Sequence, residues 1–405
     1  MQTRLSYDEA LVVALTDARR LCSEHVPLDQ AGGRIAASDL QAPFDLPGFA
    51  NSAMDGFAVR AVDLAVAASE GLPLRATILA GDLDRYRLEP GTTMAIMTGA
   101  PMPQGADTVV IHEQARQEAD RVWLPADARA GGNVRAADDD CAAGTPVLSA
   151  GDVLTPARLA VLASFGMTQV EVVRRPRVTI LTTGDELIAA DRPLGHGQRY
   201  NSNGPLLAGL LADAGAEIMA ARHCGDDPAH LVRELATLCA PEVDLLVTCG
   251  GVSAGEADHL RSTIATLGEV QFWKLRMKPG MPALFGRVAA TPVFALPGNP
   301  VSVGVTFQVL VRPLLDHMLG RAARRSMQVR LATAWAKPHP RLEFLRVTLA
   351  QDEDGAWLAT PLAHQGSGAL SKLAAADALL RLDDGIREYQ PGDLLQAQWL
   401  PGASP

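Results

Sequence analysis

The sequence is poor in aromatic residues and has no long apolar run. Only 4% of its 405 residues are Phe, Trp or Tyr. No stretch approaches the roughly 20 apolar residues that a membrane-spanning helix needs. The first residues, MQTRLSYDEA, lack the apolar core of a secretion signal. We therefore expect a cytoplasmic protein that does not interact with membranes.

Cysteine and histidine are present without the spacing that metal sites need. Nine histidines form no ligand-spaced cluster, and no Cys-x-x-Cys pair occurs. Neither a zinc site nor a disulfide framework is therefore expected. The five cysteines are scattered: Cys22, Cys141, Cys224, Cys239 and Cys249.

Positive charge is also scarce. The chain has 36 Lys and Arg against 46 Asp and Glu, a net charge of −10, which argues against general nucleic-acid binding. A hydrophobic content of 48% with 20% charged residues is typical of a soluble globular protein. At this length two to four domains are expected, and 36 Gly with 27 Pro predict many tight turns.

The first part of the chain, residues 1–173, reads as a mixed α and β region. Ser6 and Glu9 have the spacing of a capping box before a predicted helix over residues 6–22. Asp55-Gly56 favours a hairpin. Short strands and turns over about residues 50–145 predict an inserted β subdomain. A further helix is expected at residues 156–165, with Pro156 at its first position.

The pattern changes after Arg174-Arg175-Pro176, which reads as a linker. Strands and helices then alternate over residues 174–322, which predicts a three-layer α/β domain. From residue 327 to 405 the chain returns to short strands, and a β-barrel-like domain is expected. The fold class is therefore multidomain α/β plus β.

The most informative loop is GGVSAGEAD, residues 250–258. It follows the apolar run 245–249, so it lies at the carboxyl end of a predicted buried strand, where open α/β sheets bind ligands. Gly250 and Gly251 allow close approach to an anion, and Ser253 can donate a hydrogen bond. The alternative is an ordinary glycine-rich turn with acidic helix caps.

Carboxylates occur in three such loops. A parallel sheet brings the loops at its carboxyl edge together, so these side chains can surround a magnesium ion bound to a phosphate group. One acidic loop would mean little, whereas three on one edge indicate a metal-assisted phosphate site. The pairs are Asp185 with Glu186, Asp226 with Asp227, and Glu256 with Asp258.

The run FWKLRMKPG, residues 272–280, carries three cations. If it is extended, Lys274, Arg276 and Lys278 point to one face, where they would repel one another unless an anion or carboxylates lie between them. The alternative is an exposed strand face paired with surface acids. Arg346, in a later predicted strand, can also contribute to an anion site.

Six motifs in this order resemble the molybdopterin molybdenumtransferase family, which includes MoeA and the gephyrin E domain. The resemblance covers nearly the whole chain. It implies an elongated homodimer and a transferase that converts adenylylated molybdopterin and molybdate into molybdenum cofactor and AMP, with Mg²⁺. The motifs are NSAMDGFAVR, MTGAPMP, TTGDEL, GGVSAGEAD, FWKLRMKPG and LPGNPVS.

The resemblance also assigns residues to the active cleft, and the N-terminal group is expected to complete the cleft of the partner subunit. Together with the loops above, it gives catalytic candidates, substrate or anion-binding candidates, and candidate metal ligands. The catalytic group is Asp55, Thr98, Asp140, Glu186 and Asp258. The binding group is Arg135, Gly250, Gly251, Ser253, Lys274, Lys278, Pro297, Pro300, Arg346 and Ser367, and the metal group is Asp185, Glu186, Asp226 and Asp258.

Three positions depart from the family pattern: Phe57 replaces a usual Tyr, Asp138 a usual Gly, and Met281 a usual Lys. Arg276 can replace the positive charge lost at Met281.

Two other functions compete with the transferase. Adenylylation of molybdopterin by ATP would need only the central domain, and a non-enzymatic scaffold would need an extra domain or long linker. The expected partners are a molybdopterin adenylyltransferase and molybdoenzymes that accept the cofactor.

Overall fold

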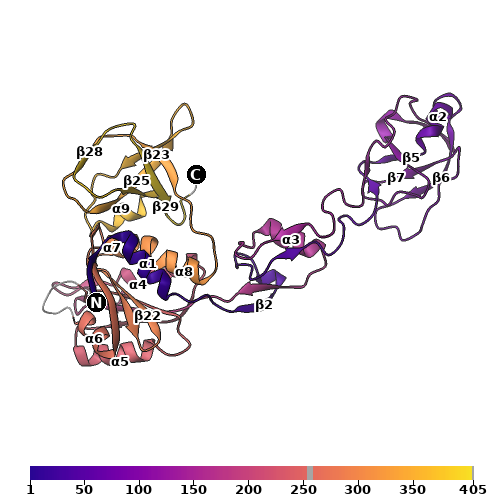
Figure 1. The fold of residues 1–405 in the computed structure, drawn as a ribbon. Coiled ribbons are helices and arrows are strands. Elements are labelled where there is room, and N and C mark those ends of the chain that lie inside the picture. The colour runs from indigo at the N-terminus through magenta and orange to yellow at the C-terminus, as the bar shows by residue number, and fades with distance from the viewer. Residues whose placement is uncertain (253–258, 404–405) are drawn as a thin grey trace. The chain divides into compact units, whose positions relative to one another are not determined.

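The computed structural model describes residues 1–252 and 259–403, and the chain divides into two compact units. The first contains residues 1–38, 150–155 and 169–405, and the second contains residues 39–149 and 156–168. Figure 1 labels the helices and strands of both units. In the described part of the chain, no helix combines the length and apolarity needed to cross a membrane.

A seven-stranded sheet forms the centre of the first unit. Four neighbouring strands, β22, β18, β14 and β17, are parallel. The side chains of β22, β18 and β14 are largely buried, as the apolar runs predict, whereas most side chains of the edge strand β17 are exposed or half-buried. The first strand of the chain, β1, joins the far edge by pairing with β19. In spatial order the strands are β1 (Gln2–Leu5), β19 (Gly268–Leu275), β21 (Leu284–Val288), β22 (Thr291–Leu296), β18 (Leu245–Cys249), β14 (Arg177–Thr183) and β17 (Glu217–Cys224).

Helices cover both faces of this sheet, which confirms the predicted three-layer α/β architecture (Figure 1). On one face, α5 (Pro228–Leu238) and α6 (Leu260–Leu267) bury leucine and isoleucine side chains spaced three or four residues apart. The other face is covered by α1 (Tyr7–Asp17), α4 (Asn203–Asp213) and one long helix. That helix consists of α7 (Pro300–Thr306), the π-helical segment η4 (Phe307–Val311) and α8 (Arg312–Met318).

Helix α1 begins as predicted but ends earlier. Ser6 and Glu9 form the capping box in full. The prediction that the helix continues to residue 22 is wrong, because it ends at Asp17. Strand β2 (Ser23–Pro27) follows and pairs with β13 (Gln169–Val173). The backbone of β2 is therefore hydrogen-bonded to a strand far away in the sequence, which the apolar spacing of the segment does not predict. The short helix η1 (Leu28–Gln30) comes next.

The C-terminal strands close into a five-stranded β-barrel, which confirms the predicted barrel-like domain. Pairing of β25 with both β26 and β27 closes the ring, and β20 (Met277–Lys278) adds to β25 from outside. The C-terminal domain also contains a two-stranded ribbon and a short helix. The ribbon pairs β24 (Trp335–Lys337) with β28 (Arg387–Tyr389), and the helix is α9 (Leu370–Ala374). The ring contains β25 (Leu342–Gln351), β26 (Trp357–Pro361), β23 (Met327–Leu331), β29 (Leu394–Trp399) and β27 (Ala378–Leu382).

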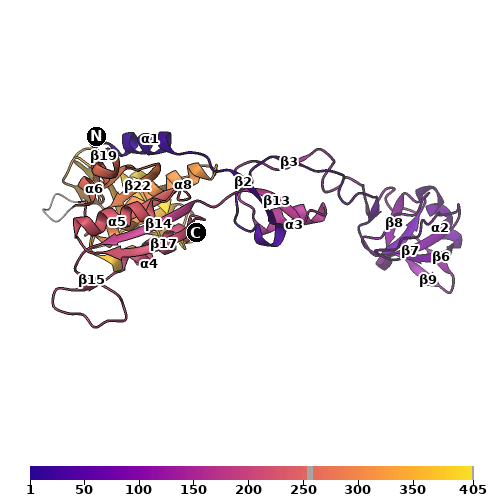
Figure 2. The ribbon, with the colours of Figure 1, turned by 90° about the horizontal axis from the view of Figure 1, so that it is seen from below.

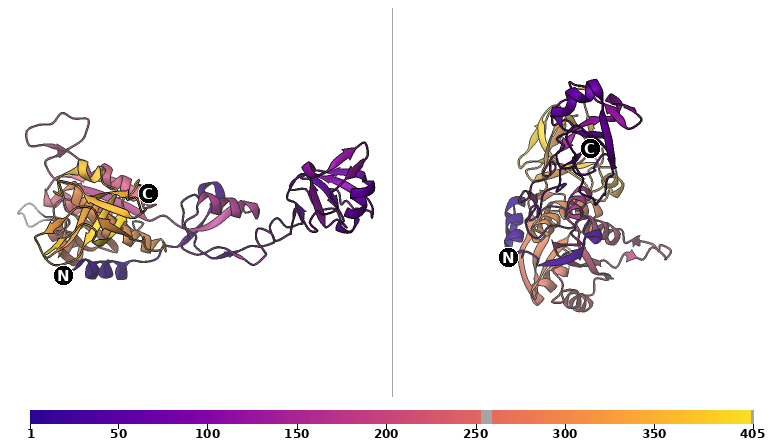
Figure 3. Two further views of the ribbon diagram at one scale, coloured as in Figure 1. Left: turned by 90° about the horizontal axis from the view of Figure 1, so that it is seen from above. Right: turned by 90° about the vertical axis from the view of Figure 1, so that its right-hand side faces the viewer.

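The second unit is built on a six-stranded sheet, drawn in purple in Figure 3. Apolar clusters that include Phe57, Leu72, Ile78 and Ile96 pack around it. Two strand pairs, β11 (Val134–Arg135) with β4 (Asn51–Ser52) and β12 (Pro146–Leu148) with β3 (Leu40–Gln41), accompany it. The sheet order is β8 (Thr108–Ile111), β5 (Gly56–Val59), β7 (Thr93–Ile96), β6 (Leu72–Ile78), β10 (Arg121–Trp123) and β9 (Arg116–Glu118); the helical segments are η2 (Ala61–Asp63), α2 (Leu64–Glu70), η3 (His112–Gln114) and α3 (Pro156–Ser164).

The hairpin predicted at Asp55-Gly56 is wrong. β4 pairs with β11, whereas β5 pairs with β7 and β8, so the two strands flanking the turn belong to different sheets. Gly56 is needed for packing, because a Cβ there would lie 2.1 Å from the carbonyl oxygen of Val110. The local turn signal was real, but long-range pairing decides where each strand goes.

Candidate active site

The carboxyl ends of three parallel strands lie in line at one edge of the α/β sheet. In the register of the sheet, Thr182 of β14 is opposite Cys249 of β18, which is opposite Leu296 of β22. Each strand then runs into a glycine-containing loop. The sequence therefore places several loops where an open α/β sheet binds its ligand.

Glycine allows two of these loops to approach each other closely. Gly250 has a φ of +97°, and a Cβ there would lie 2.5 Å from Oγ1 of Thr183. The Cα of Gly250 would be 3.6 Å from a Cβ built on Gly298. A larger residue at Gly250 would be strained and would also clash with β14, so this loop keeps its backbone accessible to a ligand.

A cavity of about 450 Å³ opens between these loops. Six residues predicted from the sequence line it: Glu186, Asp226, Gly250, Gly251, Pro297 and Pro300. Gly368, next to the predicted Ser367, also lines it. The remaining lining residues were not predicted as site residues: Thr183, Gly184, Leu187, Arg199, Tyr200, Asn201, Ser202, Asn203, Val252, Pro282, Gly298 and Asn299.

The polar residues missed by the sequence analysis gather at the start of α4. Asn203 donates from Nδ2 to the carbonyl oxygen of Gly298 at 2.7 Å, and its buried Oδ1 has no partner in the described structure. Asn201 donates to Oγ1 of Thr182 at 2.8 Å and accepts from the backbone N–H of Gly204. The run of polar residues before Pro205 was the available signal, since it precedes a helix that starts at the sheet edge.

A loop between β14 and α4 carries part of the cavity wall. Its strands β15 (Leu187–Ile188) and β16 (Arg199–Tyr200) pair in parallel, and Figure 2 shows the loop projecting from the α/β sheet. This brings Arg199 and Tyr200 back to the cavity beside Glu186. The distance along the sequence hides that proximity.

The acidic loops after β14 and β17 are bonded to each other. The backbone N–H of Asp226 donates to Oδ1 of Asp185 at 3.0 Å, and that of Asp185 donates to Oδ2 of Asp226 at 3.4 Å. Of the predicted metal ligands in the described structure, Glu186 and Asp226 line the cavity, whereas Asp185 does not. The arrangement holds two carboxylates from separate strands at one opening.

The donor set fits a magnesium ion that is shared with a substrate. Within residues 1–252 and 259–403, no group of three or more His, Cys, Asp or Glu side chains is arranged to hold a metal by itself. Mg²⁺ usually needs one or two protein carboxylates and takes its other ligands from phosphate and water. Glu186 and Asp226 can supply these two carboxylates. Ser253, Glu256 and Asp258 lie outside the described residues.

The predicted single cationic face of residues 274–278 is wrong. Lys274 has a φ of +65°, which breaks the alternation of an extended strand, and β19 ends at Leu275. The following β20 pairs with the barrel strand β25, and Nζ of Lys278 lies 2.8 Å from Oε1 of Glu343. Nζ of Lys274 lies 4.1 Å from the centre of the Trp273 ring. Neither lysine lines the cavity, and their roles in anion binding stay predictions.

Arg346 holds the loop that carries Ser367. Its side chain is buried, and burial lowers its pKa. The guanidinium donates to the carbonyl oxygens of His364 and Gly366 and to Oε1 of Gln365, at 2.8, 3.1 and 3.2 Å. Oγ of Ser367 in turn accepts a hydrogen bond of 2.9 Å from Asn299, which lines the cavity. Arg346 therefore reaches the site through this loop, and direct anion binding by Arg346 stays a prediction.

In the second unit, the structure brings two of the four predicted residues together. Oδ1 of Asp55 accepts two hydrogen bonds of 2.7 Å from Thr98, one from its backbone N–H and one from Oγ1. Arg135 is exposed on β11. Asp140 is also exposed, and its backbone N–H donates to the carbonyl oxygen of Leu46. Asp55 and Thr98 thus form an ordered carboxylate–hydroxyl pair at the surface.

Replacing Thr98 with valine is expected to raise the pKa of Asp55. The N–H of Thr98, and then its hydroxyl, hold the pKa of Asp55 below its ordinary value of 3.8, because both donors favour the charged form. The valine variant keeps the backbone N–H donor and loses the hydroxyl donor. Since the folded pKa is lowered, the stabilisation is present above pH 3.8 and is lost as the pH falls through the lowered pKa. Carboxyl-detected NMR titration measures the change, and an unchanged Asp55 pKa would contradict the pairing.

The fold and cavity define a class of α/β protein with a ligand-sized cavity at the carboxyl edge of its sheet. Three family models match the chain in order. They describe the MoeA N-terminal region (domain I and II) over residues 5–166, a probable molybdopterin binding domain over residues 179–317, and the MoeA C-terminal region (domain IV) over residues 328–400.

Similar proteins agree with these models. Molybdopterin molybdenumtransferase 2 of Mycobacterium tuberculosis is 38% identical over 384 residues, covering 92% of this chain and 93% of its own. The molybdopterin molybdenumtransferase of Bacillus subtilis is 34% identical, covering 98% and 94%. A crystal structure of a MoeA molybdopterin biosynthesis protein from Pyrococcus horikoshii has a TM-score of 0.83 at 30% identity, covering 98% and 99%. The chain belongs to the molybdopterin molybdenumtransferase family, whose members are transferases of molybdenum cofactor biosynthesis.

Proposed function

We propose that the protein inserts molybdenum from molybdate into adenylylated molybdopterin and releases AMP, in a reaction that depends on Mg²⁺. One observation carries the proposal. The cavity at the carboxyl edge of the sheet combines two carboxylates, Glu186 and Asp226, with the glycines Gly250 and Gly251 in its lining. A phosphoanhydride needs charge neutralisation, which a Mg²⁺ ion held by these carboxylates would supply, and close backbone approach, which the two glycines allow.

The walls of the cavity suit the two ends of such a substrate. Gly250 and Gly251 let the backbone approach phosphate oxygens, as glycine-rich loops before helices do. The buried Oδ1 of Asn203, which has no partner in the described structure, can accept a hydrogen bond from a ring N–H or amino group. The volume of about 450 Å³ lies within the range of small-ligand sites.

Glu186 and Asp226 are the described residues that would hold magnesium, with Asp258 as a further candidate outside the described residues. When bound, Mg²⁺ neutralises developing charge on the phosphate groups and lowers the pKa of a water molecule. Asp185 supports Asp226 through their reciprocal hydrogen bonds. Its predicted role as a direct ligand has no support from the cavity lining.

Molybdate is proposed to bind beside this cavity, near Ser367. Arg346 fixes the loop, and the backbone N–H of Val301 donates to the carbonyl oxygen of Ser367 at 3.2 Å. Lys278 supplies a positive charge, although Glu343 is paired with it.

The sulfur ligands for molybdenum come from the pterin. The protein's own Cys249 is buried, which raises its pKa to about 12 and keeps it protonated and unreactive.

The proposal includes a homodimer in which Asp55, Thr98, Arg135 and Asp140 of one subunit complete the site of the other. Sequence resemblance supports the dimer, and the ordered Asp55–Thr98 pair supplies a surface carboxylate held in one orientation. A molybdopterin adenylyltransferase that delivers substrate and molybdoenzymes that accept product are the proposed partners.

An AMP-release assay tests this function. Purified protein, adenylylated molybdopterin and Mg²⁺ are mixed with and without molybdate, and AMP and active cofactor are measured. We expect both products only when molybdate and Mg²⁺ are present. A parallel reaction with ATP and unmodified molybdopterin tests adenylylation. Adenylylated product from that reaction, with no AMP from the first, would replace the proposed activity, and no product from either would favour a scaffold.

A further inference from the structure

A second cavity, of about 230 Å³, lies beside the segment that joins β13 to β14. Three arginines line it: Arg34, Arg175 and Arg321. They come from three separate segments, which follow η1, β13 and α8. This cavity shares no lining residue with the candidate active site. The remaining lining residues are Gly32, Gly33, Ile35, Val173, Ala212, Asp213, Gly215 and Leu319.

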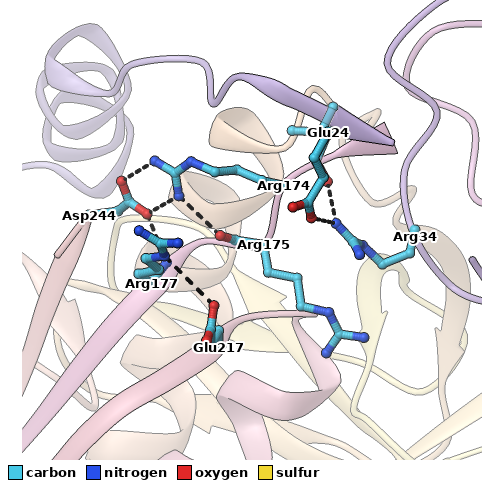
Figure 4. Close-up of polar contacts among 8 residues, drawn as sticks. Glu24, Arg34, Arg174, Arg175, Arg177, Glu217 and Asp244 are labelled. Carbon is cyan, nitrogen blue, oxygen red and sulfur yellow. Dashed lines mark hydrogen bonds and ion pairs between the residues drawn. The ribbon is translucent and has the colours of Figure 1, made fainter. Parts of the chain in front are cut away.

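The neighbours of Arg175 along the chain are paired with carboxylates. Arg174 makes a two-pronged contact with Asp244, at 2.6 and 2.7 Å, and Nε of Arg177 lies 3.8 Å from Glu217 (Figure 4). In the same figure the guanidinium of Arg175 extends away from these carboxylates. Within the part of the chain that the structure describes, it makes no hydrogen bond or ion pair. An arginine with five N–H donors is therefore available at the cavity wall.

The other two arginines are only partly neutralised. Arg34 pairs with Glu24 and donates to the carbonyl oxygen of Val173 at 3.0 Å. Arg321 donates from one terminal nitrogen to Asp316 at 3.0 Å, while its buried Nε has no partner in the described structure. Both side chains therefore hold a cation in place at the cavity and still have capacity to donate.

The surroundings carry more positive than negative charge. Asp213, a carboxylate in the cavity lining, is itself bonded by Arg312 at 2.6 Å and Arg324 at 3.2 Å. Glu24, Asp213 and Asp316 thus pair with four arginines. With Arg175 counted as well, five arginines stand against three carboxylates around the cavity, in a protein of net charge −10. Burial, and then the charge of Arg312, lower the pKa of Arg324. Cations held together in this way repel one another unless an anion joins them.

We propose that this arginine cavity binds a small tetrahedral oxyanion of the phosphate class. Arg175 would supply the free guanidinium, and Arg34 and Arg321 the flanking charge. A cavity of about 230 Å³ is smaller than the roughly 300 Å³ at which sites for larger organic ligands begin, so a free ion suits it better than a nucleotide. Glycines at residues 32, 33 and 215 keep the wall open to the ion.

Calorimetric titration with inorganic phosphate at low ionic strength tests the site. The wild-type protein is expected to bind one phosphate, and Arg175→Ala to weaken this binding at least about tenfold, because charge-assisted hydrogen bonds are lost. The Arg175 side chain has no partner among residues 1–252 and 259–403, so the melting temperature and the transferase activity should not change. Arg177→Ala is the matched control, since it removes an arginine two positions away that does not line the cavity.

Four results would overturn the proposal. Phosphate affinity that is the same in Arg175→Ala and wild type would place the ion elsewhere, and so would equal losses in Arg175→Ala and Arg177→Ala. AMP serves as the second probe and is expected to bind this site no more tightly than free phosphate. Arg175-dependent binding of AMP that is tighter than that of phosphate would contradict the assignment to a free ion. Absence of any phosphate binding at millimolar concentration would also reject the site.

Discussion

Glu186→Gln is expected to lower molybdate-dependent AMP release by more than about 100-fold while the protein stays folded. Loss of a residue that only supports a metal ligand typically costs 10- to 100-fold, and Glu186 is proposed as a ligand itself. Glutamine keeps the size and the oxygen but removes the charge that attracts Mg²⁺. Because Glu186 is exposed, its replacement should change the free energy of unfolding by less than about 0.5 kcal/mol.

The matched control for this variant is Glu217→Gln. Glu217 is a carboxylate of the same domain, its side chain is 53% exposed, and it does not line the cavity. The control should release AMP at the wild-type rate. Raising the Mg²⁺ concentration should partly restore Glu186→Gln if the lost function is metal binding. Turnover by Glu186→Gln within threefold of wild type would refute the metal assignment.

Asp316→Asn is expected to lower the free energy of unfolding by about 3–5 kcal/mol, the usual effect of breaking a buried ion pair. Oδ1 of Asp316 accepts from Nε of Arg312 at 2.9 Å and from Arg321 at 3.0 Å. The side chains of Asp316 and Arg312 are only 5% and 4% exposed. A neutral amide would leave the buried positive charge of Arg312 with less negative charge to balance it. Arg312 and Asp316 lie near the end of the long helix whose first residue, Pro300, lines the active-site cavity.

Urea denaturation followed by circular dichroism measures this loss. Asp213→Asn is the control, because Asp213 also bonds to Arg312 but its side chain is 37% exposed, so water can replace it. We expect a loss below about 1 kcal/mol for the control, as for exposed pairs. If Asp316→Asn unfolds at the same urea concentration as the control, Asp316 does not hold this helix end in place.

The sequence predicted the parts of the fold that depend on local pattern. The apolar runs 178–182 and 245–249 are buried parallel strands, and the Ser6–Glu9 capping box starts a helix. Strand ends followed by glycine and carboxylates also predicted where the cavity lies, because parallel strands present such loops at one edge. Six predicted site residues accordingly share one cavity.

Features that depend on distant contacts were not predictable in this way. The positive φ of Lys274 ends the extended geometry within an apparently continuous strand. The burial of Arg346 depends on the loop at residues 364–366, which no local pattern connects to it. Asn201 and Asn203 reach the site because α4 starts at the sheet edge, and their separation of 15 and 17 residues from Glu186 hides this. In each case, contacts between residues far apart in the sequence determine the conformation or position of the side chain.

The most direct test of the account is a crystal structure of the protein with adenylylated molybdopterin and Mg²⁺ but without molybdate. We expect the phosphoanhydride to lie between Glu186, Asp226 and the Gly250–Gly251 backbone, with the metal bound to at least one of these carboxylates. The pterin should extend along the wall formed by Asn203 and Pro297. Substrate bound away from this cavity, with Glu186 and Asp226 facing only solvent, would contradict the account.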